Sequence, residues 1–183
     1  GLLAIGGDGT LYEVINGLSE NKSDDKIPVG VLPEGTGNAF ARDISLTDKP
    51  LDYLINSILN KQTRKVDVGK FTTDEISKYF VNIIGLGFVA DVVKTANPLK
   101  FLGSAAYTLG VLYHLIKMNT FNLKLTIDDK VIERENIFVE ISNTKYTGKD
   151  FYMAPSAEID DGLLNVTLLN KAGRMTVVGG LQK

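Results

Sequence analysis

Residues 1–18 read GLLAIGGDGTLYEVINGL, and this stretch decides the fold class. An apolar run at 2–5 is followed by the turn GGDGT (6–10) and then by apolar residues at helical spacing. The pattern predicts a buried strand, a tight turn and an amphipathic helix over 10–18, with Thr10 as its N-cap. Glycines let backbone N–H groups approach an anion, and a helix N-terminus carries the positive end of the helix dipole. The turn is therefore a candidate phosphate-binding loop.

Asp8 stands in the middle of this turn, although a carboxylate repels phosphate. The residue is useful if Mg²⁺ lies between the two groups, directly or through water, since Mg²⁺ usually keeps several waters and takes one or two carboxylates. The alternative is a plain strand-to-helix turn in which Asp8 is a cap. The local pattern leaves both interpretations open.

A second glycine turn strengthens the first interpretation. A predicted strand at 27–33 leads into PEGTGN (33–38), and AFARDI (39–44) begins another helix. A third helix is predicted over 51–61, with one apolar face. Such alternation is typical of a parallel α/β layer, whose ligands bind at the carboxyl edge of the sheet. Two glycine turns at one edge favour a nucleotide cleft. The apolar face of the third helix comprises Leu51, Leu54, Ile55, Ile58 and Leu59.

After Thr63 the sequence pattern changes from alternating strands and helices to mainly strands. We expect a partial α/β nucleotide-binding domain over 1–63 and a mostly antiparallel β-sandwich domain over 64–183. The second domain contains a helical insertion at about 98–118. Its predicted strands are 66–72, 78–85, 121–128, 131–143 and 162–170, with a hairpin turn at Asp128-Asp129.

Composition excludes several classes of function. The chain has 183 residues, a formal net charge of −2, no cysteine and a single histidine, His114. The charge argues against a nucleic-acid partner, and the missing cysteines exclude disulfides and thiolate metal sites. The most apolar long stretch, 101–118, is too short and too polar for a transmembrane segment. Because the chain begins inside a strand, we expect upstream strands to be missing.

Four blocks, in order, resemble the diacylglycerol kinase catalytic domain family, which includes bacterial lipid kinases and sphingosine kinases. The blocks are GGDGTLYEVINGL, PVGVLPEGTGNAFAR, RKVDVGK and FYMAPSAEIDDGLLNV. The resemblance implies an NAD kinase/diacylglycerol kinase-like α/β layer, a β-sandwich domain and a cleft between them. It also implies ATP and Mg²⁺ as co-substrates and transfer of the γ-phosphoryl group to a lipid hydroxyl.

The resemblance also assigns roles by position. Asp67 matches a carboxylate that joins Asp8 in a water-bridged Mg²⁺ network, and Asp161 matches the general base of bacterial members. A swap with Asp160 stays open, and sphingosine kinases give the base role to the aspartate at position 8. The residues that match the two nucleotide-binding turns are Gly6, Gly7, Asp8, Gly9 and Thr10, and Gly35, Thr36, Gly37 and Asn38.

Two positions depart from the family pattern. Ala39 stands where many bacterial members have an aspartate, and Val93 stands where sphingosine kinases have one for the amino head group. The second departure favours a neutral lipid such as diacylglycerol. We expect a lipid substrate that is presented at a membrane surface, and a cytoplasmic enzyme for which peripheral contact with the membrane stays open. A homodimer is left open. An NAD kinase and a lipid- or nucleotide-binding module without turnover are the alternatives.

Overall fold

The computed structural model describes residues 1–20, 27–87, 120–148 and 151–170. By their contacts, the residues form two compact units, Gly1–Ile83 with Ser142–Asn165 and Ile84–Ile141 with Val166–Lys183. Every candidate site residue named above falls in the first unit. The predicted helical insertion, His114 and Val93 lie outside the described residues, and the predicted domain boundary after Thr63 stays a prediction.

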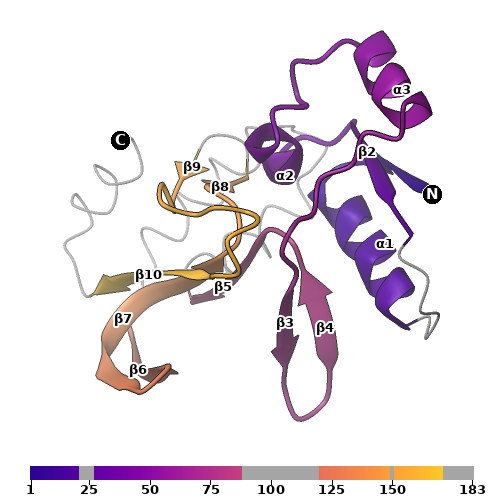
Figure 1. Cartoon of the computed structure of the whole chain (residues 1–183). Coiled ribbons are helices and arrows are strands. Elements are labelled where there is room, and N and C mark those ends of the chain that lie inside the picture. Colours follow the sequence, from indigo (N-terminus) through magenta and orange to yellow (C-terminus); the bar gives the residue numbers. More distant parts are fainter. Residues whose placement is uncertain (21–26, 88–119, 149–150, 171–183) are drawn as a thin grey trace. The chain divides into compact units, whose positions relative to one another are not determined.

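The strand–turn–helix order of the N-terminal part is confirmed (Figure 1). β1 (Leu2–Gly6) and β2 (Val29–Pro33) pair in parallel, with Ile5 opposite Leu32 and Gly6 opposite Pro33. Helix α1 (Asp8–Glu20) follows β1 and packs on it, and α2 (Ala39–Asp43) follows β2. The two glycine turns therefore leave the sheet at the same edge, as parallel pairing requires.

A small apolar core holds this layer together. Ala4 of β1, Leu11 of α1, Phe40 of α2 and Val81 are all buried, and further aliphatic side chains pack around them. Each fully buried Leu or Phe side chain contributes roughly 1.5–3 kcal/mol to stability. This core fixes where both helices begin relative to the sheet edge.

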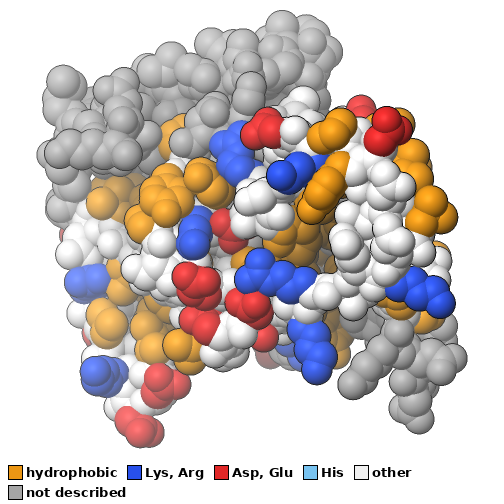
Figure 2. Space-filling model, turned by 45° about the horizontal axis from the view of Figure 1, so that its top comes forward, with side chains coloured by type: hydrophobic (Ala, Val, Ile, Leu, Met, Phe, Trp, Pro, Cys, Tyr) orange, Lys and Arg blue, Asp and Glu red, His pale blue; other side chains and the backbone are white. Residues whose placement is uncertain are grey.

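One local prediction, Thr10 as the N-cap, is wrong. Helix α1 begins at Asp8, because the Leu11 N–H already donates to the Gly7 carbonyl oxygen at 3.1 Å. Thr10 is thus inside the first turn and is not the N-cap. Helix α3 (Leu51–Leu59) exists, but only Leu54 of its predicted apolar face is buried, and Leu59 is 72% exposed. Hydrophobic side chains reach the surface at several places on the face that Figure 2 presents.

The predicted strand at 66–72 is shorter, and the one at 78–85 is two strands. β3 (Gly69–Thr72) and β4 (Ser77–Phe80) form an antiparallel hairpin, and β5 (Ile83–Gly87) joins a different sheet. A buried asparagine of α1 holds β4: Asn16 Nδ2 donates to the Tyr79 carbonyl oxygen, and Asn16 Oδ1 accepts the Tyr79 N–H, both at 2.9 Å. Val81 and Asn82 separate β4 from β5 and belong to neither strand. The side chain of Asn82 donates a hydrogen bond to Asp8 in the candidate site.

The remaining strands are antiparallel where their pairing is defined. β6 (Phe121–Ile127) pairs with β7 (Lys130–Ser142) around the predicted turn, where Asp128 has a φ of 50°. β7 also pairs with β5 and with β10 (Asn165–Asn170). The short strands β8 (Tyr146–Thr147) and β9 (Phe151–Tyr152) form a separate pair. β10 starts three residues later than predicted, because Gly162, with a φ of 75°, still belongs to a turn.

Candidate nucleotide and phosphoryl-transfer site

The two glycine turns contact each other through their backbones. The Glu34 N–H donates to the Gly6 carbonyl oxygen at 3.0 Å, and Gly7 lies against Gly35. A Cβ on Gly35 would overlap the Cα of Gly7, and a Cβ on Gly7 would lie only 3.0 Å from the Cα of Gly35. Both positions therefore require glycine because of this close approach.

Gly35→Ala should consequently lower the free energy of unfolding by about 1–3 kcal/mol, because the added methyl forces the turns apart. The matched control is Gly17→Ala, since Gly17 is exposed in α1 and has open space where its Cβ would be. That change should stabilise the protein slightly, by roughly 0.5–1 kcal/mol. Urea denaturation measures both, and equal stabilities for the two variants would show that the turns are not in contact.

Asn38 shapes the second turn. Its backbone is left-handed, with a φ of 52°, and its side chain folds back on the turn. Asn38 Oδ1 accepts the Gly35 N–H at 3.0 Å, and Asn38 Nδ2 donates to the Gly35 carbonyl oxygen at 2.7 Å. Asparagine tolerates this conformation better than most residues. Within the described residues, the Asn38 side chain thus has a structural task.

Asp8 is a cap, but for the helix of the other turn. Its Oδ2 accepts the Ala39 N–H at 3.0 Å, and its Oδ1 accepts the Phe40 N–H at 3.1 Å, so the carboxylate closes the start of α2. Oδ1 also accepts Asn82 Nδ2 at 2.7 Å. A carboxylate oxygen has about two acceptor positions, so Oδ2 keeps one for a further donor such as a water molecule.

The first turn of α1 remains open to a ligand. The N–H groups of a helix's first turn have no acceptor within the helix, and Gly9 and Thr10 are exposed. The hollow beside this turn is lined by Gly6, Gly7, Leu11 and Phe40 among others, and its volume of about 10 Å³ suits at most a water molecule. A phosphate would therefore have to bind on the outside of the turn.

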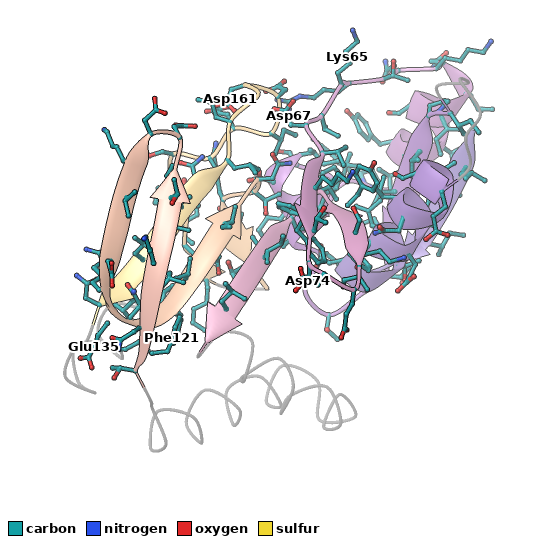
Figure 3. The ribbon with its side chains drawn as sticks, turned by 90° about the horizontal axis from the view of Figure 1, so that it is seen from below. Lys65, Asp67, Asp74, Phe121, Glu135 and Asp161 are labelled. Atoms are coloured by element: carbon teal, nitrogen blue, oxygen red, sulfur yellow. The ribbon has the colours of Figure 1, made fainter. Side chains whose placement is uncertain are left out.

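Asp67 and the 160–162 turn are neighbours (Figure 3). Gly162 N–H donates to Asp67 Oδ2, and the Asp67 N–H donates to the Ile159 carbonyl oxygen, both at 2.6 Å. Figure 3 shows Asp67 and Asp161 close together, with Asp74 at the far end of the β3–β4 hairpin. Asp67 and Asp161, which are far apart in the sequence, are thus close together in space.

Asp160 and Asp161 have different surroundings. Asp160 Oδ2 accepts two hydrogen bonds from the Arg64 guanidinium, at 3.0 and 2.8 Å, in an exposed ion pair. Asp161 Oδ1 accepts only the Leu163 N–H, at 2.9 Å, among the contacts of the described residues, and the residue is exposed. The carboxylate of Asp161 is therefore the more available of the two.

Two absences hold for the part of the chain that the structure describes. These residues contain no cluster of three or more carboxylate or histidine side chains that could hold a metal ion. None of the helices in the described ranges is long and apolar enough to cross a bilayer.

Asp43, at the end of α2, gives the unit a pH-dependent stability. Burial raises the pKa of Asp43 above its usual value of 3.8, while the Lys145 N–H, which donates to Oδ2 at 3.4 Å, acts in the opposite direction. The folded state therefore binds this proton more tightly than the unfolded state. Stability is lost as pH rises from about 3.8 through the pKa of the folded protein.

Asp43→Asn should remove that loss, so the melting temperature of the variant should gain on the wild type as pH rises from about 4 to 7. Asp48→Asn is the control, because Asp48 is exposed in the same segment. Thermal denaturation across this pH range gives the comparison. Parallel curves for wild type and Asp43→Asn would contradict the assignment.

Asn82 and Asn143 were not singled out from the sequence. Asn82 donates to Asp8, and Asn143 Nδ2 donates to the Asp67 carbonyl oxygen at 3.0 Å. The signal that could have found them is an asparagine within an apolar strand run, in FVNII and EISNT, since asparagine is depleted in strands.

Comparison with known families agrees with this layout. The diacylglycerol kinase catalytic domain matches residues 1–71. The YegS C-terminal NAD kinase beta sandwich-like domain matches residues 82–183, more than half of the chain. The chain belongs to the diacylglycerol kinase family. The expected fold class, an NAD kinase-like α/β layer followed by a β-sandwich, is confirmed by these matches and by the structural neighbours below.

Relatives within the diacylglycerol kinase family are similar along most of the chain. A diacylglycerol kinase of Staphylococcus carnosus (strain TM300) is 33% identical over 175 residues, which are 93% of this chain and 54% of the relative. A diacylglycerol kinase of Bacillus subtilis (strain 168) is 30% identical over 173 residues, 93% of this chain and 55% of the relative. The chain thus spans about half the length of these relatives.

Solved structures carry the same fold. A crystal structure of a diacylglycerol kinase from Bacillus anthracis str. Sterne superposes with a TM-score of 0.71 at 25% identity, covering 100% of this chain and 58% of the other. Another structure from that organism gives a TM-score of 0.75 at 24% identity, with 99% and 60% coverage.

Proposed function

We propose that this chain is part of an ATP- and Mg²⁺-dependent lipid kinase. It would transfer the γ-phosphoryl group of ATP to the hydroxyl of diacylglycerol or a related neutral lipid. The observation that carries the proposal is that Asp8, Asp67 and Asp161 lie in one compact unit whose helix α1 has exposed residues, Gly9 and Thr10, in its first turn. Cytoplasmic location, contact with a membrane surface and any homodimer stay predictions.

The open turn of α1 supports the ATP part of the proposal. The backbone N–H groups of the exposed residues Gly9 and Thr10, together with the helix dipole, would bind phosphate oxygens. The second turn would contribute by its position, since its own helix N-terminus is already capped by Asp8. Phosphoryl transfer depends mainly on such positioning and on charge neutralisation.

The acidic groups fit Mg²⁺ in the way this ion prefers. Mg²⁺ usually takes one or two carboxylates and keeps several waters, so a cluster of three side chains is not needed. Asp67 Oδ1 accepts no hydrogen bond among the described contacts, and Asp8 Oδ2 keeps one acceptor position. Asp67 would hold the ion directly or through water, and Asp8 through water. When bound, the ion would offset charge on the phosphates.

Asp161 is the better candidate for the general base. Its carboxylate is exposed and has one oxygen free of described contacts, so it could accept the proton of a lipid hydroxyl. Asp160 is engaged by Arg64, and Asp8 is engaged by three N–H groups. Both are therefore less available to a substrate hydroxyl.

The test is a transfer assay with the protein as its gene encodes it. The protein is incubated with γ-labelled ATP, Mg²⁺ and dispersed diacylglycerol, sphingosine or NAD, one acceptor at a time. We expect label on diacylglycerol. Label on NAD would replace the proposal by an NAD kinase, and no label on any acceptor, with ATP still bound, would leave a binding module without turnover.

A further inference from the structure

We propose that Asn82 is a positioning residue that holds the Asp8 carboxylate for phosphoryl transfer, and that Asn143 holds Asn82 in turn. This inference rests on the proposed function. It is carried by hydrogen bonds within one compact unit and by two buried amide oxygens that have no hydrogen-bond partner among the described residues.

Asn82 is the part of this arrangement that reaches Asp8. Its Nδ2 donates to Asp8 Oδ1 at 2.7 Å, the shortest of the three bonds to that carboxylate. The other two donors are backbone N–H groups of α2, and these two bonds are sufficient for the carboxylate to cap the helix. Asn82 adds a donor from a separate part of the chain, so a rotation of the carboxylate about its Cβ–Cγ bond would break this hydrogen bond in addition to the two backbone ones.

Asn143 fixes the backbone around Asn82. Its N–H donates to the Asn82 carbonyl oxygen at 2.8 Å, and its Nδ2 donates to the Val81 carbonyl oxygen at 2.9 Å. The same Nδ2 donates to the Asp67 carbonyl oxygen at 3.0 Å. Asn143 is 0% exposed. One buried amide thus ties the backbone of Asp67 to the segment that holds Asp8.

A continuous path of hydrogen bonds results. It runs from the Asp8 carboxylate through Asn82 and Asn143 to Asp67, and from Asp67 Oδ2 to the Gly162 N–H beside Asp161. The path joins the residues to which the proposed function gives the metal and the base. A displacement of Asn82 would therefore change the placement of Asp8 relative to Asp67.

The orientation of both side-chain amides has an energetic cost. Asn82 Oδ1 and Asn143 Oδ1 are buried with no hydrogen-bond partner among the described residues. Rotating either amide by half a turn would aim that oxygen at a carboxylate or at carbonyl oxygens, so the orientation is fixed by the acceptors. Buried unpaired oxygens are unfavourable, and a fold that only needed to be stable would gain from apolar residues here.

The first variant is Asn82→Ala, measured in the protein as its gene encodes it. We expect kcat to fall about 10- to 100-fold, because small misplacements of reacting groups have effects of this size. The KM for ATP should stay within about threefold, since the backbone N–H groups of the α1 turn make no contact with the Asn82 side chain among the described hydrogen bonds. A wild-type kcat would overturn the proposal.

The second variant is Asn82→Asp, which adds a pH profile. A protonated carboxyl at position 82 can still donate to Asp8, whereas an ionised one repels it. Activity of this variant relative to the wild type should therefore rise as pH is lowered from about 8 to 6. A constant ratio across that range would overturn the positioning role.

Asn16→Ala is the matched control, because Asn16 is also a buried asparagine with backbone partners on β4 but has none among the acidic residues. It should lower the melting temperature and leave kcat unchanged. An equal fall in kcat for Asn16→Ala and Asn82→Ala would reduce Asn82 to a structural role and overturn the proposal.

Failure of the proposed function would be recognised separately, as a wild-type protein that labels no acceptor. The melting temperature of Asn82→Asp relative to the wild type still tests the contact with Asp8 in that case. We expect it to fall as pH rises, and a difference independent of pH would show that the two side chains do not meet.

Discussion

Asp161→Asn is expected to lower kcat by about 10²–10⁴-fold, the usual contribution of a general base. Asparagine has the same shape and keeps an oxygen for the Leu163 N–H, so the turn before β10 should persist. ATP binding should be largely kept, because the base contacts the acceptor hydroxyl and not the nucleotide. Label transfer to diacylglycerol gives kcat, and calorimetric titration with ATP gives the affinity.

Asp160→Asn is the matched control for this prediction. It removes only the exposed ion pair with Arg64, an interaction worth about 0–1 kcal/mol, so rates should change little. If Asp160→Asn abolished turnover while Asp161→Asn did not, the two assignments would be exchanged. If neither variant lost more than about threefold, the base would have to be sought elsewhere, with Asp8 as the next candidate.

The largest effect is expected for Asp8→Ala, which should reduce turnover by at least about a thousandfold. The change removes a negative charge from the proposed phosphate-binding turn. It also leaves three N–H groups without the carboxylate to which they donate hydrogen bonds. Because α2 loses its cap, the free energy of unfolding should also fall by about 1–2 kcal/mol. Label transfer and thermal denaturation measure the two effects separately.

Asp74→Asn controls for the loss of one negative charge, because Asp74 lies at the far end of the β3–β4 hairpin (Figure 3). Its rate and stability should match the wild type. A rate for Asp8→Ala close to that of Asp74→Asn would contradict the site, since no carboxylate in the first turn would then be needed. A large loss of stability with a normal rate would make Asp8 a cap alone.

Local patterns were sufficient where a feature depends on neighbouring residues. The turns GGDGT and PEGTGN end apolar runs and begin helices, and the structure has strands and helices in those places. The same patterns failed where the tertiary environment decides. The apolar stripe of α3 was correctly recognised, but whether a stripe is covered depends on what packs against it, and most of this one is exposed.

The roles proposed for Asp67 and Asp161 came from resemblance to a family, since nothing in the local sequence connects them. The structure places them in one turn region through the hydrogen bond from the Gly162 N–H, next to Asp161, to Asp67 Oδ2, which spans 95 residues of the chain. Asn82 escaped notice altogether, because its importance comes from a carboxylate 74 positions away.

The sequence by itself therefore determined the α/β layer, its glycine turns and the hairpin, all of which follow from periodicity and backbone preference over a few residues. Only the tertiary structure decided that Asp8 caps the helix of the other turn, that Asp160 rather than Asp161 forms an ion pair among the described residues, and that two asparagines link the acidic groups. Hydrogen bonds of this kind depend on where distant segments meet in space, and a linear pattern carries no record of that.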